Sequence, residues 1–326
     1  MTTRIFAICC SLLAAGLLLT ACGTLKRPET STPMSTDDKA SFLKRAKEPQ
    51  VFGLTAYSSE EGAVFAGAFR QHKGQVSRSP FRSGSNTTTP VLAINGDKVL
   101  ALIDSSAAES WITAEATIDL KLFGLIGPNP FEKQPRHVYD TIGGFAGVLP
   151  KMTIDDVHVE NAVLYIRNAR GPLGPLTRWE KEPYLDAVLG ADFLRSFQFV
   201  RISLRGRYVV LSATDPYPTP ANAIAVLPTV ELQGGIAVEA VVNGEPTPML
   251  IDIAGDFEIA MDAPESPTLR QVSLGDIVFR QTQVDSTYEL GLGLQAAPRI
   301  GRQLLEKYDI VINNLGREII FERPTP

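Results

Sequence analysis

The stretch that decides the fold runs over residues 90–113 and reads PVLAINGDKVLALIDSSAAESWIT. Its pattern recurs, with no gap between the matched positions, over residues 237–261 as AVEAVVNGEPTPMLIDIAGDFEIAM. Both copies place an Asn-Gly pair between two apolar runs, which is typical of a tight hairpin turn. Both also end the second run in an aspartate, Asp104 or Asp252. The sequence therefore predicts two related β units, each with a strand that ends in an aspartate.

The two units also close alike. Val188-Leu189-Gly190 in the first unit is matched by Arg299-Ile300-Gly301 in the second, and a short helical stretch follows in both. We expect a strand, a glycine turn and a last strand after each helix. The sequence thus predicts an N-terminal lobe over residues 51–217 and a C-terminal lobe over residues 218–326, joined near residues 218–227.

The first lobe carries an extra segment, between residues 114 and 149, that the second lobe lacks. It contains HVYDTIGGFAG, in which Gly143 and Gly144 are turn residues and Tyr139 is an aromatic of the kind found in ordinary hairpins. This pattern predicts a glycine-tipped hairpin that belongs to the first lobe alone.

Composition indicates a globular, mostly β body with short helices. Hydrophobic residues make up 44% of the chain and charged residues 21%, which is enough to bury a substantial core. The apolar runs are short and rich in β-branched residues, and Gly and Pro are frequent. The net charge of −5 is modest, and Lys and Arg do not cluster among aromatic residues. Nucleic acid is therefore not an expected partner.

The first residues have the layout of an export signal. Arg4 precedes an apolar run that is too short to cross a bilayer, and Leu19-Thr20-Ala21-Cys22 follows. These four residues resemble the lipobox of bacterial lipoproteins. The resemblance implies removal of residues 1–21 and a lipid on Cys22 that anchors the chain to a membrane, facing the periplasm. In such lipoproteins an Asp after the cysteine favours the inner membrane, so the resemblance, with Gly23 at that place, implies the outer membrane.

Residues 22–50 are rich in Thr, Ser, Pro, Lys and Asp without apolar periodicity, so we expect a flexible tether. Cys9 and Cys10 lie in the signal, which leaves the body without a disulfide, a thiol nucleophile or a cysteine-based metal site. The three histidines lack metal-ligand spacing. No metal or cofactor is expected.

A strand that ends in aspartate, a turn, and a later apolar pair with glycine before a helix resemble the aspartic peptidase architecture. Within it, the chain is similar to the bacterial retropepsin-like proteins, over roughly residues 85–323. The resemblance implies a cleft between two lobes with Asp104 and Asp252 as the catalytic pair on its floor. It also implies one flap over the cleft, formed by the hairpin with Tyr139, Gly143 and Gly144. Because both lobes lie in one chain, no oligomer is required to build the site.

The implied activity is that of an aspartic endopeptidase acting on periplasmic polypeptides. Two carboxyl groups that lie close together cannot both ionise, so they share a proton. The ionised group takes a proton from a bound water, which attacks the peptide carbonyl, while the other donates to the carbonyl oxygen. The pair titrates as a unit, so the sequence does not assign these roles.

The aspartate loops depart from the Asp-Thr/Ser-Gly of the family, since they read Asp-Ser-Ser-Ala and Asp-Ile-Ala-Gly. Ser105 keeps the hydroxyl that would cross-link the two loops, whereas Ile253 has none. Ser106 and Ala254 add a Cβ where the family has glycine, which would strain a backbone that needs a positive φ. The alternative function is therefore a catalytically degenerate relative that binds extended peptides without cleaving them.

Three further interpretations concern neighbouring polar residues. Asp186 and Asp192 flank Gly190 and could form a carboxylate cluster or cap the short helix. A strand can end in aspartate simply because Asp favours turns. A serine hydrolase would have to use Ser105 or Ser106, but the sequence has no Gly-x-Ser-x-Gly elbow and no histidine paired with either serine.

Overall fold

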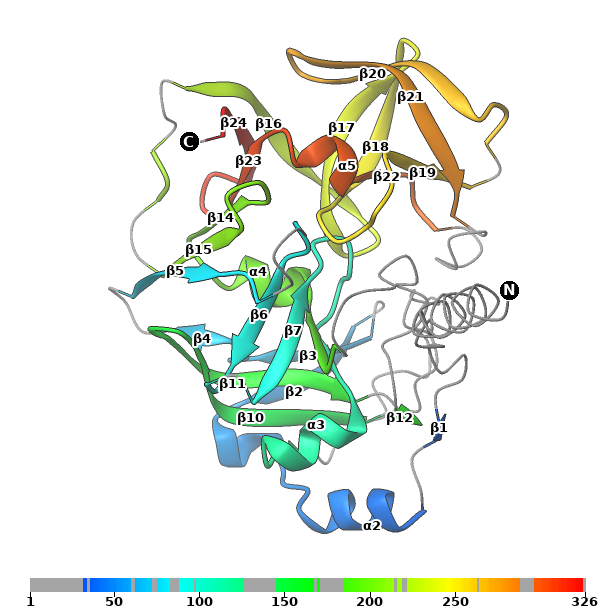
Figure 1. The fold of residues 1–326 in the computed structure, drawn as a ribbon. Helices are drawn as coiled ribbons and strands as arrows, with labels where there is room; N and C mark the ends of the chain where they lie inside the picture. Colours follow the sequence, from blue (N-terminus) through cyan, green and yellow to red (C-terminus); the bar gives the residue numbers. More distant parts are fainter. Residues whose placement is uncertain are drawn as a thin grey trace, which may run out of the picture.

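The computed structural model of the chain folds into two β lobes that lie one above the other (Figure 1). The structure describes residues 32–33, 36–59, 62–71, 75–82, 88–96, 98–125, 145–166, 169–170, 185–213, 216–218, 222–262, 264–287 and 296–324. The predicted fold class, mostly β with two lobes and a few short helices, is confirmed.

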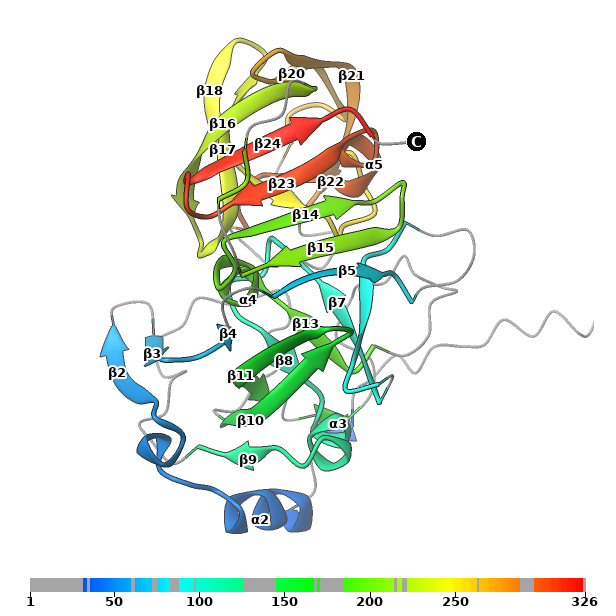
Figure 2. The same cartoon turned by 90° about the vertical axis from the view of Figure 1, so that its left-hand side faces the viewer.

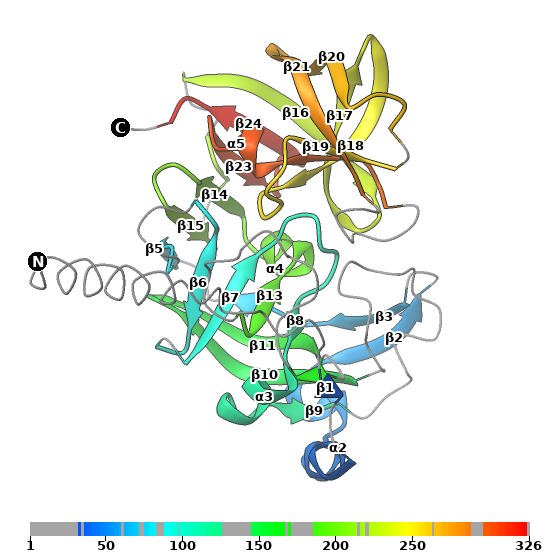
Figure 3. The ribbon, with the colours of Figure 1, turned by 45° about the vertical axis from the view of Figure 1, so that its right-hand side comes forward.

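The first lobe is built on an eight-stranded sheet in the order β6-β7-β13-β8-β11-β10-β9, with β4 paired to β11. A further two-stranded hairpin, β2-β3, lies at its side (Figure 3), and β1 pairs with β12. The elements of this lobe are β1 (Thr32–Pro33), α2 (Thr36–Lys44), η1 (Pro49–Phe52), β2 (Thr55–Ser59), β3 (Gly62–Ala66), β4 (Arg70–Gln71), β5 (Val76–Pro80), β6 (Val91–Ile94), β7 (Val99–Ile103), β8 (Trp111–Ile112), α3 (Ala114–Asp119), β9 (Phe123–Gly124), β10 (Phe145–Ile154), β11 (Val157–Ile166), β12 (Ala169–Arg170), β13 (Ala187–Leu189), α4 (Ala191–Arg195), β14 (Phe199–Ser203) and β15 (Tyr208–Ser212).

The second lobe is a barrel of six strands in the order β17-β18-β22-β19-β21-β20, which closes because β17 pairs with both β18 and β20. Its strand order repeats that of β6-β7-β13-β8-β11-β10 in the first lobe. The elements of this lobe are β16 (Ala223–Leu232), β17 (Gly235–Val242), β18 (Glu245–Asp252), β19 (Ile259–Met261), β20 (Thr268–Leu274), β21 (Ile277–Ser286), β22 (Arg299–Gly301), α5 (Arg302–Leu305), β23 (Asp309–Asn313) and β24 (Glu318–Glu322).

The Asn-Gly pairs of the repeat form the predicted hairpin turns. Asn95 and Asn243 have φ of 53° and 50°, and the glycine after each also has a positive φ. Asparagine tolerates this left-handed conformation better than most residues. Each asparagine also joins the turn to a neighbouring strand, because its side-chain oxygen accepts the amide of Thr153 (2.8 Å) or Gln271 (3.1 Å). The asparagine therefore forms the turn and fastens the sheet beside it.

A single sheet links the lobes, in the order β5-β15-β14-β23-β24-β16 (Figure 2). Three of its strands come from each lobe, and β14 and β23 pair antiparallel at its centre, with Arg201 opposite Val311. One face of the sheet contributes Val200, Ile202, Ile310 and Ile312 to the largest buried apolar cluster, which contains residues of both lobes. The lobes consequently share a core and do not merely touch.

The prediction of a flexible tether through residue 50 is wrong over residues 36–50, where α2 and η1 form. The sequence of α2 has little amphipathic character, so its stability must come from tertiary contacts. The ring of Phe42 is buried and packs against Gly124 on β9, and the amide of Lys47 donates to the Gly124 carbonyl (2.8 Å). The ordered body thus begins before residue 51.

Among the helices described, none is long and apolar enough to span a membrane.

Candidate active site

Equivalent strands carry the two predicted catalytic aspartates to the region where the lobes meet. Asp104 follows β7, which runs parallel to β13, and Asp252 ends β18, which runs parallel to β22. The glycine that follows each partner strand explains the second repeated motif. A Cβ on Gly190 would lie 2.5 Å from the carbonyl oxygen of Glu109, and one on Gly301 would lie 2.2 Å from that of Phe257. Glycine is thus required for the strand to pack against the loop after each aspartate.

Asp104 is held by the loop that follows it. It is 4% exposed, and its Oδ1 accepts hydrogen bonds from the Ser106 amide (2.9 Å), the Ser106 hydroxyl (2.7 Å) and the Ala107 amide (3.3 Å). Both the backbone and the side chain of Ser106 thus bind the carboxyl group of Asp104.

Asp252 is held in a similar way through one oxygen and differently through the other. Its Oδ1 accepts the amides of Ala254 (3.1 Å) and Gly255 (2.7 Å), as expected of an equivalent loop. Its Oδ2 lies 3.3 Å from Nη1 of Arg299, so a guanidinium is its ion-pair partner. Asp252 is 3% exposed.

The charge of Asp104 acts on the buried carboxyl group of Asp252. Burial raises the pKa of Asp252 from 3.8 to about 6, and the charge of Asp104 is the second cause of the increase. Arg299 and the amide of Gly255 act in the opposite direction because they stabilise the carboxylate. A carboxyl group with a pKa near 6 can hold a proton under mildly acidic conditions and lose it at neutral pH.

The cross-link between the two loops is present in one direction, as Ser105 and Ile253 predict. The Ser105 hydroxyl donates to the Ile251 carbonyl and lies 3.4 Å from the Ile253 amide, which donates to it. Ile253 is fully buried and its side chain is apolar, so it returns no side-chain hydrogen bond. The expected strain at Ser106 and Ala254 does not occur, because neither is among the described residues with a positive φ.

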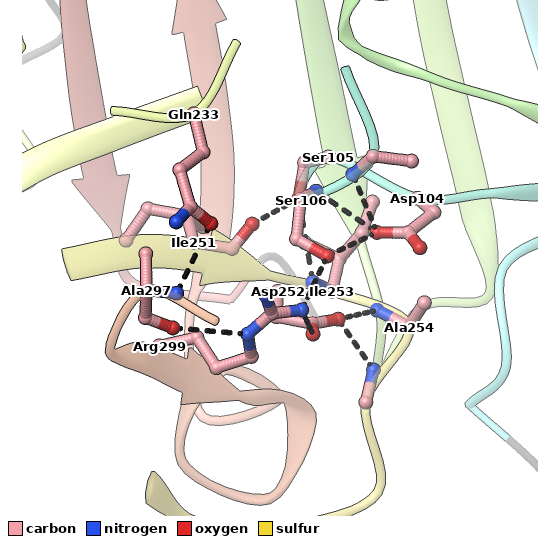
Figure 4. A network of polar contacts seen from close by, with 12 residues as sticks. Asp104, Ser105, Ser106, Gln233, Ile251, Asp252, Ile253, Ala254, Ala297 and Arg299 are labelled. Atoms are coloured by element: carbon pink, nitrogen blue, oxygen red, sulfur yellow. Dashed lines mark hydrogen bonds and ion pairs between the residues drawn. The ribbon is translucent and has the colours of Figure 1, made fainter. Parts of the chain in front are cut away.

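Arg299 is the site residue that sequence reasoning missed. It occupies the position in β22 that Val188 occupies in β13 of the first lobe, and it is 3% exposed. Its Nη1 lies 3.2 Å from the hydroxyl of Ser106 as well as 3.3 Å from Asp252 (Figure 4). The signal that could have revealed it is the arginine in Arg299-Ile300-Gly301, where the first lobe has the apolar Val188.

Three neighbouring residues have structural roles. Asp192 lies in the first turn of α4, where it accepts the hydroxyl (2.6 Å) and amide (3.0 Å) of Ser110 and the amide of Phe193 (2.7 Å). Burial raises its pKa to about 7, although these hydrogen bonds favour the ionised form. Asp186 accepts the amide of Leu100 (3.1 Å), and Trp111 packs against Tyr165 with a ring separation of 5.2 Å.

Several predicted features lie outside the described residues. These are the flap residues Tyr139, Gly143 and Gly144 and the lipidation site Cys22. In the part of the chain that the structure describes, no three His, Cys, Asp or Glu side chains gather as a metal site would require.

Comparison with known proteins gives no family assignment. No protein-family model and no curated protein matches the sequence. Among solved structures, basic 7S globulin from soybean is similar with 12% sequence identity and a TM-score of 0.44, over 76% of this chain and 94% of the soybean chain. A retropepsin-like aspartic protease from Rickettsia conorii is similar with 17% identity and a TM-score of 0.22, over 30% of this chain and 88% of the protease.

Proposed function

We propose that this chain is an aspartic-type endopeptidase that hydrolyses polypeptides through Asp104 and Asp252 under mildly acidic conditions. One observation carries the proposal. Two buried aspartates come from equivalent strand ends of the two lobes, and burial, together with the charge of Asp104, raises the pKa of Asp252 to about 6. A pair of carboxyl groups that hold one proton between them is the requirement for this chemistry.

The proposed reaction needs one ionised and one protonated carboxyl group. The ionised group removes a proton from a water molecule, and the water oxygen forms a bond to the peptide carbonyl carbon. The protonated group gives its proton to the carbonyl oxygen, which produces a tetrahedral intermediate. Collapse of this intermediate breaks the C–N bond. The departing nitrogen takes a proton from the carboxyl group that received one from the water, and one hydroxyl of the intermediate gives its proton to the other carboxylate, so that the pair again holds one proton. The hydrogen bonds to Oδ1 of each aspartate support this chemistry because they fix both carboxyl planes.

The proposed substrate is an extended polypeptide that lies between the lobes and is covered by the hairpin with Tyr139. If Cys22 carries a lipid, the substrates are periplasmic or membrane-associated polypeptides near the anchor. These points rest on the sequence resemblance and on the position of the aspartates between the lobes.

The second candidate function is peptide binding without cleavage. Two observations favour it. Ile253 supplies no hydroxyl to the cross-link between the loops, and Arg299 forms an ion pair with one of the two carboxylates. Both functions use the same region between the lobes, so they differ only in whether the peptide bond is broken.

One experiment separates the two functions. The purified full-length chain is incubated in detergent with a mixed peptide library from about pH 4 to pH 8, beside Asp104→Asn and Asp252→Asn, and products are identified by mass spectrometry. The endopeptidase predicts cleavage that is strongest at the acidic end and is abolished by either substitution. Cleavage that survives both substitutions contradicts the assigned pair. Peptide binding without cleavage at any pH supports the second candidate.

A further inference from the structure

We propose that Arg299 is a latch on the aspartate pair, which holds Asp252 ionised and so prevents the two carboxyl groups from sharing a proton at neutral pH. The inference rests on the proposed function in one respect, since the latch restrains catalysis only if the pair is catalytic. Its structural part, the control of the protonation of Asp252 by Arg299, can be tested by itself.

The position of Arg299 distinguishes the two lobes. The first lobe has Val188 at the corresponding place in β13, and Val188 is fully buried in an apolar cluster. The second lobe places a cation there, beside a carboxylate that is also buried. Burying a charge is costly unless it is paired and hydrogen-bonded. The arginine and the aspartate therefore depend on each other, and either would be unfavourable alone.

A chain of polar contacts connects the aspartates through Arg299 (Figure 4). Asp104 accepts the hydroxyl of Ser106, the oxygen of that hydroxyl lies 3.2 Å from Nη1 of Arg299, and the same nitrogen lies 3.3 Å from Oδ2 of Asp252. The other end of the guanidinium is fixed as well, because its Nε donates to the Ala297 carbonyl (3.3 Å). The arginine is thus held in place from two sides.

The charges explain why this arrangement opposes catalysis. A pair of carboxyl groups that shares one proton has a net charge of −1. Two ionised carboxylates with one guanidinium have the same net charge without any proton. Arg299 can therefore replace the shared proton electrostatically, but it cannot replace it chemically, because a guanidinium does not give up a proton in proteins. The latched pair has no acid to protonate the carbonyl oxygen of a substrate.

Acid is expected to release the latch. The charged groups that act on Asp252 are Asp104 and Arg299, and burial together with Asp104 raises its pKa to about 6. Below this pH, protonation removes the charge of Asp252, weakens its attraction to Arg299 and supplies the missing acid. Because Arg299 acts to lower the pKa of Asp252, its removal must raise that pKa further.

Arg299→Met tests the latch, because methionine keeps much of the side-chain volume and removes the charge. Cleavage by the full-length chain is measured across about pH 4 to pH 8. We expect the pH above which cleavage declines, here called the pH limit, to rise by about one unit. This corresponds to about tenfold more cleavage near pH 7.5 than in the wild type. Arg302→Met is the matched control. Arg302 is also a buried arginine, but it pairs with Asp256 (3.0 Å), and we expect no shift of the pH limit.

A second measurement tests the latch without relying on cleavage activity. Titration of the carboxyl carbon of Asp252 by 13C NMR must show a higher pKa in Arg299→Met than in the wild type. Arg299→Gln, which keeps a donor and a similar length, serves if the methionine variant does not fold. An unchanged pKa of Asp252, or an unchanged pH limit in an active variant, overturns the latch. Absence of cleavage in every variant, together with a raised pKa, overturns the proposed activity and supports control of Asp252 by Arg299.

Discussion

Ser105 donates its hydroxyl to the carbonyl oxygen of Ile251, across the boundary between the two lobes. The same hydroxyl oxygen accepts the Ile253 amide at 3.4 Å, and the Ser105 carbonyl accepts the amide of Ile236 at 2.8 Å. One residue of the first aspartate loop therefore joins two segments of the second lobe.

Removal of the Ser105 hydroxyl should destabilise the protein. Ser105→Ala leaves the buried carbonyl of Ile251 without this donor, and we expect the free energy of unfolding to fall by about 1 to 3 kcal/mol. Urea unfolding followed by circular dichroism measures the change. Ser105→Thr, which keeps the hydroxyl, is the control and should retain most of the stability. Equal stability of the alanine and wild-type chains would show that the cross-link contributes nothing.

Substitutions at Asn243 should separate two contributions of this turn to the stability of the barrel. One is the side-chain hydrogen bond, and the other is the tolerance of a left-handed backbone. Asn243→Ala loses the hydrogen bond to Gln271 and places alanine, which tolerates a left-handed backbone poorly, at φ 50°. We therefore expect the free energy of unfolding to fall by about 2 to 3 kcal/mol. Asn243→Gly loses the hydrogen bond but tolerates the conformation, and should cost about 1 kcal/mol. The same order is expected at Asn95. A glycine variant less stable than the alanine variant would contradict this account.

Stability should rise as the pH falls from about 8 to 5. The pKa of Asp252 is raised to about 6 and that of Asp192 to about 7, both from 3.8. The folded state therefore binds these protons more tightly than the unfolded state. The contribution of these two groups to the free energy of unfolding is complete below the ordinary pKa of aspartate, and it is lost as the pH rises through the two raised pKa values. We expect a difference on the order of 2 to 4 kcal/mol.

Urea midpoints measured at several pH values test this dependence. Asp192→Asn removes one of the two groups and should flatten the slope, whatever its effect on the absolute stability. A slope of the opposite sign, or a slope that Asp192→Asn leaves unchanged, would contradict the assignment.

Much of the fold could be predicted because the same sequence pattern occurs once in each lobe. The Asn-Gly turns, the aspartate at the end of each second strand and the later glycine recur at matched positions, and the structure places each at an equivalent point of its lobe. The repeat also includes a turn at which the two lobes use different residue types. Left-handed residues recur between β10 and β11 and between β20 and β21, but they are Asp155 in one lobe and Gly275 in the other. Different residues meet the same backbone requirement.

The two failures of prediction have a common cause, which is that tertiary contacts decided the outcome. Helix α2 has a weak helical pattern of its own and depends on the contact of Phe42 with Gly124. The sequence does not single out Arg299, because Arg299-Ile300-Gly301 matches Val188-Leu189-Gly190 as a strand that ends in glycine. Its significance follows from the carboxylate beside it, and the sequence places Asp252 far away along the chain.

The coupling between Asp104 and Asp252 is the central claim, and titration of the two carboxyl groups tests it most directly. The chain is labelled with 13C at the aspartate carboxyl carbons, and the resonances are assigned with Asp104→Asn and Asp252→Asn. We predict that Asp252 in the wild type titrates near pH 6, and that Asp104→Asn lowers its pKa because a neighbouring negative charge is lost. A pKa of Asp252 in the ordinary range of aspartate, or one that Asp104→Asn does not change, would contradict the account.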